Sequence, residues 1–280
     1  MEIRTYANAN AFLEENLSLL EQEEAANNLI LGIALGIQQG TSVFKEAHFM
    51  GVRKGGRPLL CALQTPPRNL LVYGTPEYSE EGASTIYQYV VKEGIEVPGL
   101  IGPRAFVGPF AESWCGLAGR RWEIRQSMGV FQMEQAIPPK FAAGGMRPAV
   151  KEDQELAFRW IHEFHLEALG EADDEFCRKL VDRHLKRGEL FLWENPMPVS
   201  MAAATRRTRN GITINAVYTP PEYRGSGYAS NCVAQLSQQM LDTGYRFCAL
   251  FTNLSNPTSN KIYQAIGYQK VTEFLEVRWV

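Results

Sequence analysis

A short polar loop with two glycines, residues 224–229, has the composition of a phosphate-binding loop. An apolar, β-branched run at residues 212–219 precedes it, and residues 230–242 follow as a helix-like segment without Gly or Pro. Strand, glycine loop and helix in this order place backbone N–H groups at a helix N-terminus, where they bind phosphate. Arg224 adds a permanent cation that can contact phosphate oxygens through two N–H groups. A surface turn before a helix has the same pattern, so the loop alone does not decide between the two.

A second polar segment follows the strand-like run at residues 247–252. Asn256 stands where it would cap a helix that has Pro257 in its first turn. Gly267 stands where it would end that helix. Tyr263 lies between them, on the predicted helix, and carries a hydroxyl that can donate a proton.

Together the two segments resemble the acetyl-CoA-binding core of the GCN5-related N-acetyltransferase (GNAT) family. The pyrophosphate loop of that family has the form Arg/Gln-x-x-Gly-x-Gly/Ala, which is matched by Arg224, Gly227 and Ala229. Its second motif is an Asn followed by Tyr-x-x-x-Gly-aromatic, which is matched by Asn256, Tyr263, Gly267 and Tyr268. The resemblance covers residues 145–280.

The resemblance implies acetyl-CoA as a cosubstrate, no metal, and a cofactor site in this part of the chain. The residues implied to bind the cofactor are Val217, Tyr218, Thr219, Arg224, Gly225, Ser226, Gly227, Tyr228, Ala229, Ser230 and Asn256. Backbone N–H groups at residues 217–219 would polarise the thioester carbonyl. Tyr263 would be the catalytic residue that donates a proton to the leaving sulfur. The alternative is that Tyr263 is a core aromatic residue of an amphipathic helix.

The base that takes the proton from the acceptor amine is not evident in the sequence. Many relatives carry a Glu on the fourth or fifth strand, but residues 212–219 and 247–252 contain no carboxylate. This favours a water relay or a base from another element, and the candidates outside these strands are His162, Glu163, His165, Glu167 and Glu194. The two histidines are one helical turn apart, but no third ligand has the spacing of a metal site, so a solvated helix face is the better interpretation.

Composition excludes several classes of function. The chain has 280 residues, of which 45% are hydrophobic and 21% charged, as in ordinary globular proteins. A net charge of −3 indicates neither nucleic acid nor anionic membrane as a partner. The first residues lack the pattern of a signal peptide, and no apolar run is long enough to span a bilayer. Five scattered cysteines are expected to be reduced and buried in a cytoplasmic protein.

The sequence contains an internal repeat. Residues 72–78 and 217–223 match at five of seven positions, with an offset of 145 residues. Each half begins with helical periodicity, at 12–40 and at 154–188, and continues with strand-like segments in the same order, at 49–53, 59–64 and 69–73 and at 190–194, 199–206 and 212–218. We therefore predict an α/β fold of two tandem GNAT-like domains, each a mixed, mostly antiparallel sheet flanked by helices. The predicted domains are residues 1–140 and 145–280, joined by a Pro- and Gly-rich linker.

The first copy is expected to lack a cofactor site. Ser79, Glu80 and Glu81 stand where the second copy has its Arg, Gly and Ser, and two carboxylates would repel a pyrophosphate. Ala118 stands where the second copy has its Tyr. We expect this domain to form a wall of the substrate cleft, or to serve only in packing.

Two other groups of residues receive structural interpretations. The aromatic residues of the first half are expected in a core or between domains: Phe106, Phe110, Trp114, Trp122 and Phe131. The basic run at residues 206–209 precedes a hairpin signal, Asn210-Gly211, and is interpreted as a solvated loop, with contact to the 3′-phosphate of CoA as an alternative.

The predicted function is acetyl-CoA-dependent transfer of an acetyl group to a primary amine by direct attack on the thioester. Because the strand carboxylate is missing, a non-catalytic acyl-CoA-binding or sensor protein is the competing class. A small amine, an aminoglycoside, an amino acid and a peptide N-terminus all remain open as the acceptor, and both a monomer and a homodimer remain open as the assembly.

Overall fold

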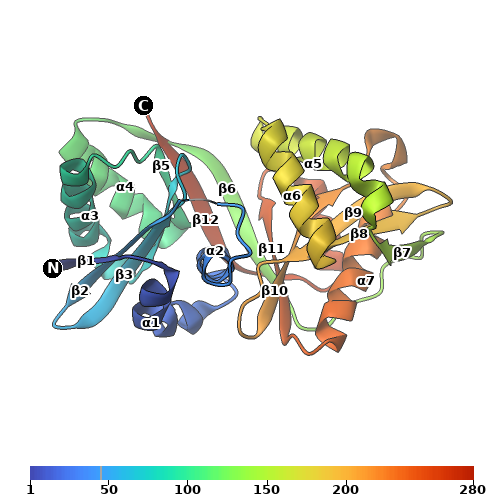
Figure 1. Ribbon diagram of the computed structural model, residues 1–280, viewed down its shortest axis with the longest axis horizontal. Helices are drawn as coiled ribbons and strands as arrows, with labels where there is room; N and C mark the ends of the chain where they lie inside the picture. Colours follow the sequence, from blue (N-terminus) through green and yellow to red (C-terminus); the bar gives the residue numbers. More distant parts are fainter. Residues whose placement is uncertain (45) are drawn as a thin grey trace. The chain divides into compact units, whose positions relative to one another are not determined.

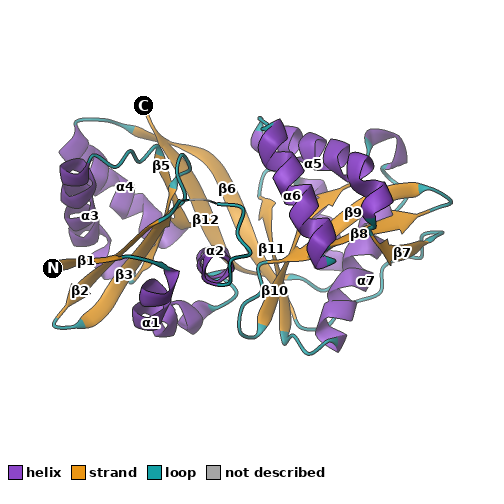
Figure 2. Cartoon of the chain, viewed as in Figure 1, coloured by secondary structure: helices purple, strands orange, loops and turns teal. Residues whose placement is uncertain are grey.

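The computed structural model describes residues 1–44 and 46–280. The chain forms two compact units, Met1–Val130 with Val271–Val280, and Phe131–Lys270 (Figure 1). Each unit contains a mixed, mostly antiparallel sheet with helices on both of its faces (Figure 2). This confirms the predicted fold class.

The sheet of the first unit has the strand order β1-β2-β3-β4-β5-β12-β6, with β4 and β5 parallel. Its elements are β1 (Glu2–Tyr6), α1 (Ala9–Leu20), α2 (Asn28–Gln38), β2 (His48–Lys54), β3 (Arg57–Gln64), β4 (Leu70–Gly74), α3 (Ser79–Glu93), β5 (Gly99–Pro103), α4 (Arg104–Ala118), β6 (Trp122–Met133) and β12 (Gln269–Trp279). Helices α3 and α4 pack on one face of this sheet, and α1 and α2 pack on the other.

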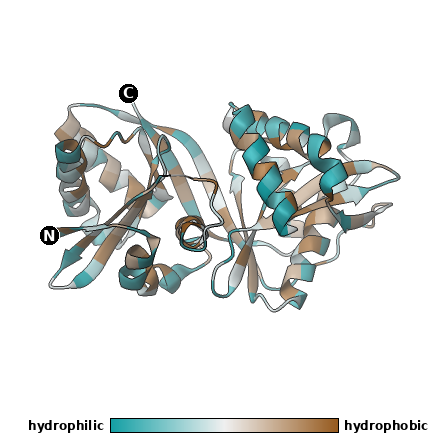
Figure 3. Ribbon diagram, in the orientation of Figure 1, coloured by the Kyte–Doolittle hydropathy of each residue, from teal (hydrophilic) through white to brown (hydrophobic). Residues whose placement is uncertain are grey.

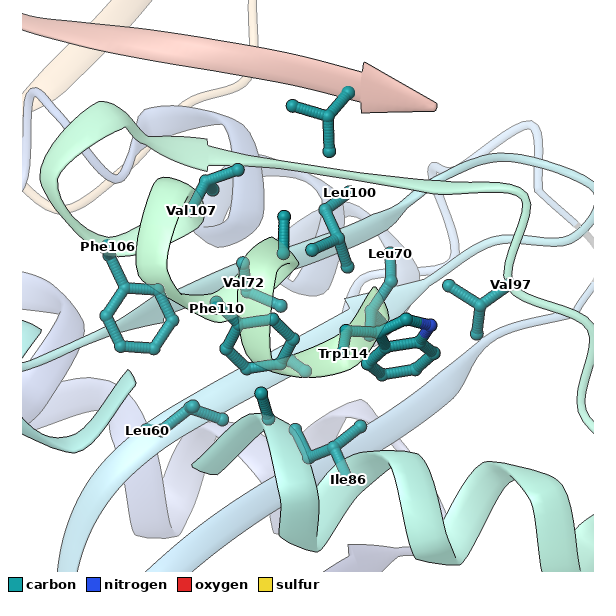
Figure 4. Close-up of a cluster of buried hydrophobic side chains, with 14 of the residues drawn as sticks. Leu60, Leu70, Val72, Ile86, Val97, Leu100, Phe106, Val107, Phe110 and Trp114 are labelled. Atoms are coloured by element: carbon teal, nitrogen blue, oxygen red, sulfur yellow. The ribbon is translucent and has the colours of Figure 1, made fainter. Parts of the chain in front are cut away.

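The predicted aromatic core is confirmed. Phe106, Phe110 and Trp114 project from α4 into the cluster under α3 and α4 (Figure 4). Trp122 is partly buried against the same cluster, and Phe131 is buried in a core of the second unit. These rings act through packing, and the burial of an aromatic side chain contributes a large share of core stability.

The sheet of the second unit has the strand order β6-β11-β10-β9-β8-β7. Its further elements are β7 (Gly145–Pro148), α5 (Gln154–Leu169), α6 (Asp174–Arg187), β8 (Leu190–Glu194), β9 (Pro198–Thr205), β10 (Gly211–Tyr218), α7 (Tyr228–Asp242), β11 (Phe247–Asn253) and α8 (Pro257–Ala265). Helix α7 covers one face, and α5 and α6 cover the other. The outward sides of α5 and α6 are hydrophilic, whereas α2 of the first unit is hydrophobic nearly all round (Figure 3).

The two units repeat the same order of helices and strands, which confirms the tandem architecture. Helices α1 and α2 and strands β2 to β4 of the first unit correspond to α5, α6 and β8 to β10 of the second. The periodic stretches at 12–40 and 154–188 each contain two helices rather than one. In the second stretch the chain breaks at Gly170, whose φ of 80° ends α5.

Strands β6 and β12 each run from one unit into the other. As a result the last ten residues lie in the first unit, where β12 is hydrogen-bonded antiparallel to β5. The predicted division of the chain at residues 140 and 145 stays a prediction, and the compact units depart from it at this C-terminal strand.

All five cysteines are buried and unpaired, as predicted. Among the described residues, no helix combines the length and the apolar character needed to cross a membrane.

Candidate functional site

Strands β10 and β11 separate halfway along their length. Within the described part of the chain, their parallel pairing runs from Gly211 and Phe247 to Thr213 and Ala249 and then ends. A bulge interrupts the pairing of β10 with β9 between Asn215 and Tyr218, and it contains a left-handed residue, Ala216, at φ 48°. An extra residue of this kind bends the strand that carries it. The end of β10 therefore diverges from β11, next to the segment that the resemblance assigns to the thioester.

The glycine loop adjoins this end of β10. After a 3₁₀ turn, Pro221–Tyr223, the chain passes through Gly225 and Gly227, both at φ 81°, and enters α7. Gly227 is the N-cap of α7 and offers no side chain to the first N–H groups of the helix. The N–H groups of a first helical turn have no partner within the helix, so those of residues 228–230 are available to an anion.

Polar side chains hold the loop in this shape. The Asn231 amide donates to Gly227 O at 2.9 Å and to Lys140 O at 3.0 Å, which ties the start of α7 to the segment after β6. The Asn195 amide donates to the Tyr228 hydroxyl at 2.8 Å. The loop is thus fixed before any ligand arrives, as a preorganised anion site requires.

Arg224 is engaged by a carboxylate of α5. Its Nη2 lies 2.7 Å from Glu167 Oε1 and 3.0 Å from Glu167 Oε2, and its Nε donates to Thr219 O at 2.9 Å. Both partners of the ion pair are about half exposed. The hydrogen bonds that Arg224 donates to Glu167 raise the pKa of Arg224 above its ordinary value. No pattern in the sequence indicates that a neighbouring carboxylate neutralises this cation.

Tyr218 connects the end of β10 to α5. Its side chain is only 4% exposed, and its hydroxyl donates to Glu163 Oε2 at 2.7 Å. Burial, followed by the hydrogen bond to Glu163, raises the pKa of Tyr218. On the other side, Ser200 Oγ donates to Tyr218 O at 3.1 Å, so both ends of the residue are fixed. Val217 packs at the edge of the core under α7.

The other candidates for a base lie in different contacts. His162 Nε2 is 3.1 Å from Asp174 Oδ1, and His165 Nδ1 is 3.5 Å from Cys177 Sγ. Glu194 pairs with Arg147 at 2.8 Å. In the described residues no group of three or more His, Cys, Asp or Glu side chains could hold a metal. Of these candidates, Glu163 is the carboxylate in contact with the end of β10.

The second motif forms the predicted helix. The Asn256 side chain caps α8 by accepting from Ser259 N at 3.0 Å, and Gly267, at φ 108°, follows the helix end. Tyr263 packs edge-on against Tyr268, with ring centres 6.0 Å apart. Burial raises the pKa of Tyr263 to about 12, so its hydroxyl stays protonated at neutral pH. Tyr263 therefore packs against the core and keeps its hydroxyl proton at neutral pH.

A surface cavity of about 600 Å³ lies between α8, the start of α7 and the segment that follows β6. Ser230 lines it, together with two lysines, Lys140 and Lys261, and apolar residues of which Pro139 and Ile262 are examples. The lysines were not among the predicted site residues. Their distance in sequence gave no signal that one cavity would bring them together.

The first unit has no such loop among its described residues. Helix α3 begins at Ser79, directly after a 3₁₀ turn, and Ser79 Oγ donates to Pro76 O at 2.7 Å. Gly82, which aligns with the glycine at the N-cap of α7, lies inside the helix, where an added Cβ would come within 2.7 Å of Leu60 Cδ1. Its role here is close packing, and the loss of the cofactor site from this unit stays a prediction.

Comparisons with known proteins agree with this geometry. The family model described as FR47-like protein matches residues 194–280. A search of curated protein sequences gave no match. Among solved structures, a GCN5-related N-acetyltransferase from Sphaerobacter thermophilus has a TM-score of 0.67 at 15% identity, covering 99% of this chain and 95% of its own. A tandem GNAT protein from the clavulanic acid biosynthesis pathway has a TM-score of 0.60 at 12% identity, covering 100% and 98%.

The chain is a tandem GNAT-fold protein. A GNAT-family acetyltransferase from Colwellia psychrerythraea also matches over 100% of this chain and 99% of its own, with a TM-score of 0.57 at 16% identity. The predicted resemblance to GNAT proteins is confirmed, and the likeness in fold extends over both units, as the prediction of two tandem GNAT-like domains requires.

Proposed function

We propose that this GNAT-fold protein is a cytoplasmic acetyl-CoA-dependent N-acetyltransferase that moves an acetyl group to a primary amine by direct attack on the thioester. The observation that carries the proposal is the separation of β10 from β11 directly beside a glycine loop at the N-terminus of α7. Either feature occurs alone in many proteins. Together they place an unpaired strand edge directly next to an anion site.

The residues present fit acetyl-CoA, which would supply an activated acetyl thioester. The backbone of Val217, Tyr218 and Thr219 would pair with the pantetheine arm as an added strand. The N–H groups of residues 225–230 and the guanidinium of Arg224 would bind the pyrophosphate. Gly225 faces open space, with no atom within 4 Å of an added Cβ, so a phosphate can approach the backbone there. Asn256 would set the position of α8 beside the ligand.

The cavity beside Ser230 suits the nucleotide end of the same ligand. Lys140 and Lys261 are both exposed, and neither forms a salt bridge with an acid among the described residues. Lysine binds phosphate as a point charge, and the proline and isoleucine side chains offer an apolar surface to an adenine ring.

We assign the proton acceptor to Glu163, acting through the hydroxyl of Tyr218. An amine with a pKa near 10.4 is neutral in only about one molecule in 2,500 at pH 7, so a proton acceptor is needed. The Tyr218 hydroxyl already donates its proton to Glu163 at 2.7 Å and keeps a lone pair for the proton of the amine. Passing one proton along this bond leaves tyrosine neutral and Glu163 protonated. Its raised pKa keeps Tyr218 neutral before and after the step.

We assign the proton donor for the leaving sulfur to Tyr263. A tyrosine hydroxyl is protonated at neutral pH, and burial raises the pKa of Tyr263 further, to about 12. Tyr263 would donate its proton to the sulfur, whereas Tyr218 would pass a proton from the amine to Glu163. A positioned donor of this kind typically contributes about 10²- to 10⁴-fold to the rate.

The proposal is tested by release of CoA thiol from acetyl-CoA in the presence of a panel of amines. Calorimetric titration with CoA measures binding separately. Binding with thiol release supports the transferase. Binding without release, over a panel that includes polyamines, aminoglycosides, amino acids and peptides, would identify the non-catalytic CoA-binding class instead. Absence of binding would overturn the proposal.

A further inference from the structure

Arg206 occupies an unusual position at the end of β9. Its φ of 45° lies in the left-handed region, which is unfavourable for a residue with a side chain. Its Nε atom is buried and has no hydrogen-bond partner. The interpretation of residues 206–209 as a solvated loop is therefore wrong for Arg206. Its guanidinium turns inward and lies 5.8 Å from the ring centre of Phe251 on β11.

No carboxylate balances this charge among the described residues. Arg183 on α6 is the charged group near enough to act on Arg206; burial first, and then this second guanidinium, lower the pKa of Arg206 to about 10. Glu189 is the acid of the neighbouring cluster, but it is already occupied by His184 Nδ1 at 3.0 Å and by Arg187 Nε at 2.6 Å. Arg206 is partly exposed, but its Nε is buried without a partner, and a cation in that position is costly unless an anion completes it.

Other unsatisfied polar atoms lie on the same face of the sheet. Thr205 pairs across the strands with Thr213, and Asn215 pairs with Ala203, which belongs to the core under α5 and α6. Cross-strand partners share a face, so all four side chains lie on the α5–α6 side. Thr205 Oγ1 and Asn215 Oδ1 are both buried without a hydrogen-bond partner. Native proteins rarely leave such atoms unpaired unless a ligand or water serves them.

This group lies where the proposed transfer would occur. Phe251 follows Ala249, the last residue of β11 that pairs with β10, so it lies on the separated part of the strand. Asn215 begins the bulge that precedes Val217. The side chains of Arg206, Phe251 and Asn215 therefore border the place where β10 and β11 separate. They lie on the face of the sheet opposite α7. We call Arg183, Thr205, Arg206, Asn215 and Phe251 the Arg206 recess.

We propose that the Arg206 recess binds the carboxylate of the acceptor, and that the acceptor is an amino acid. The proposal rests on the proposed function and specifies its substrate. The guanidinium of Arg206 would bind the carboxylate, and Asn215 Oδ1 would accept a hydrogen bond from the amine beside it. The Nε of a cation and an amide oxygen, both buried without a hydrogen-bond partner, match the two ends of a zwitterion. A diamine or an aminoglycoside would leave Arg206 unpaired.

The first test uses binding alone. Thermal unfolding is measured with CoA present, and with N-acetyl derivatives of the common amino acids or the matching N-alkylacetamides, which lack only the carboxylate. We expect at least one N-acetylamino acid to raise Tm while its decarboxylated match does not. Arg206→Gln should abolish this shift, and Arg207→Gln, a change at the exposed neighbouring arginine, should retain it. If no N-acetylamino acid stabilises the CoA complex, the recess is not a carboxylate site.

The second test uses turnover by matched acceptors, such as lysine against cadaverine and phenylalanine against phenethylamine. A charge-assisted hydrogen bond contributes about 1.5–3 kcal/mol, so Arg206→Gln should lower kcat/KM for the amino acid about 10- to 100-fold and leave that for the amine nearly unchanged. Arg206→Lys keeps the charge but loses the two parallel N–H groups of the guanidinium. Its kcat/KM for the amino acid should lie between that of the parent protein and that of Arg206→Gln. Equal use of acid and amine by the parent protein would overturn the proposal.

A purely structural role for Arg206 gives a different result. If the residue only packs on Phe251, Arg206→Gln should lower the Tm of the ligand-free protein and reduce all acceptors equally. The proposal expects the ligand-free Tm to stay or to rise, because an uncompensated, partly buried charge is removed. Failure of the proposed function is seen separately, as loss of CoA binding or of thiol release with every amine in the parent protein.

Discussion

The ion pair between Arg224 and Glu167 makes a specific prediction about CoA affinity. In the ligand-free chain the guanidinium that should bind pyrophosphate is held by a carboxylate of α5, at 2.7 Å and 3.0 Å. A phosphate must displace Glu167 to use this cation. Glu167→Gln removes the competing charge and leaves the shape of the side chain, so it should strengthen CoA binding rather than weaken it.

The size of the effect follows from exposure. The side chains of Arg224 and Glu167 are 47% and 51% exposed, and pairs of this kind contribute about 0–1 kcal/mol. Releasing such a pair should lower the Kd for CoA by up to about fivefold. Arg224→Gln removes a charge-assisted contact to phosphate and should raise Kd by about tenfold. In the Arg224→Gln background, Glu167→Gln should change Kd far less, because the two residues act on each other.

Calorimetric titration of CoA into the four proteins of this double-mutant cycle measures each term. Glu152→Gln, at another exposed carboxylate of the same unit, is the control for net charge and should leave Kd within experimental error. At high salt the difference in Kd between the parent protein and Glu167→Gln should be smaller, since exposed charges are screened. Weaker binding by Glu167→Gln, or an equal effect with and without Arg224, would refute the competition described here.

Three further predictions follow from the site and its surroundings. Tyr263→Phe should retain the fold and CoA binding while kcat and kcat/KM fall together by about 10²- to 10⁴-fold, and full turnover by this variant would make Tyr263 a packing residue. Gly227→Glu should abolish CoA binding, because it places a charged side chain at a φ of 81° beside the anion site. Calorimetric titration of the parent protein should give one CoA per chain. Two equivalent sites would contradict the loss of the loop in the first unit. Burial lowers the pKa of His184 below its ordinary 6.5, so the unfolded chain takes up the proton first as the pH falls. The free energy of unfolding should therefore fall as the pH drops through about 6.5. Unfolding curves of His184→Gln should show a weaker pH dependence in that range.

Local patterns predicted the elements around the site well. The strand at residues 190–194 was predicted with its observed ends, and Asn256 and Gly267 begin and end α8 as their residue types indicated. Such features depend on a few neighbouring residues, so propensity and capping rules are sufficient. The repeat was visible for the same reason, because its two copies keep the strand and the turn that precede the loop.

Contacts between distant segments could not be predicted. The sequence placed Glu163 and Glu167 on one helix, four residues apart, but not against Tyr218 and Arg224. Basic residues before Asn-Gly are usually solvated, and the inward turn of Arg206 depends on its left-handed backbone and on Phe251, which is far along the chain. Spacing in sequence carries no information on which faces of separate elements meet.

The position of the C-terminal strand makes the folding of the first unit depend on the synthesis of the second. Because β12 lies between β5 and β6 in the first sheet, the first unit cannot complete its sheet until the last residues have been synthesised. In the nascent chain, β5 is therefore paired with β4 alone, and its other edge stays unpaired while the whole second unit is made. A gene fragment that encodes either half alone would lack a strand that its sheet requires. This gives a reason, independent of catalysis, for a copy that has lost its loop to persist beside one that has kept it.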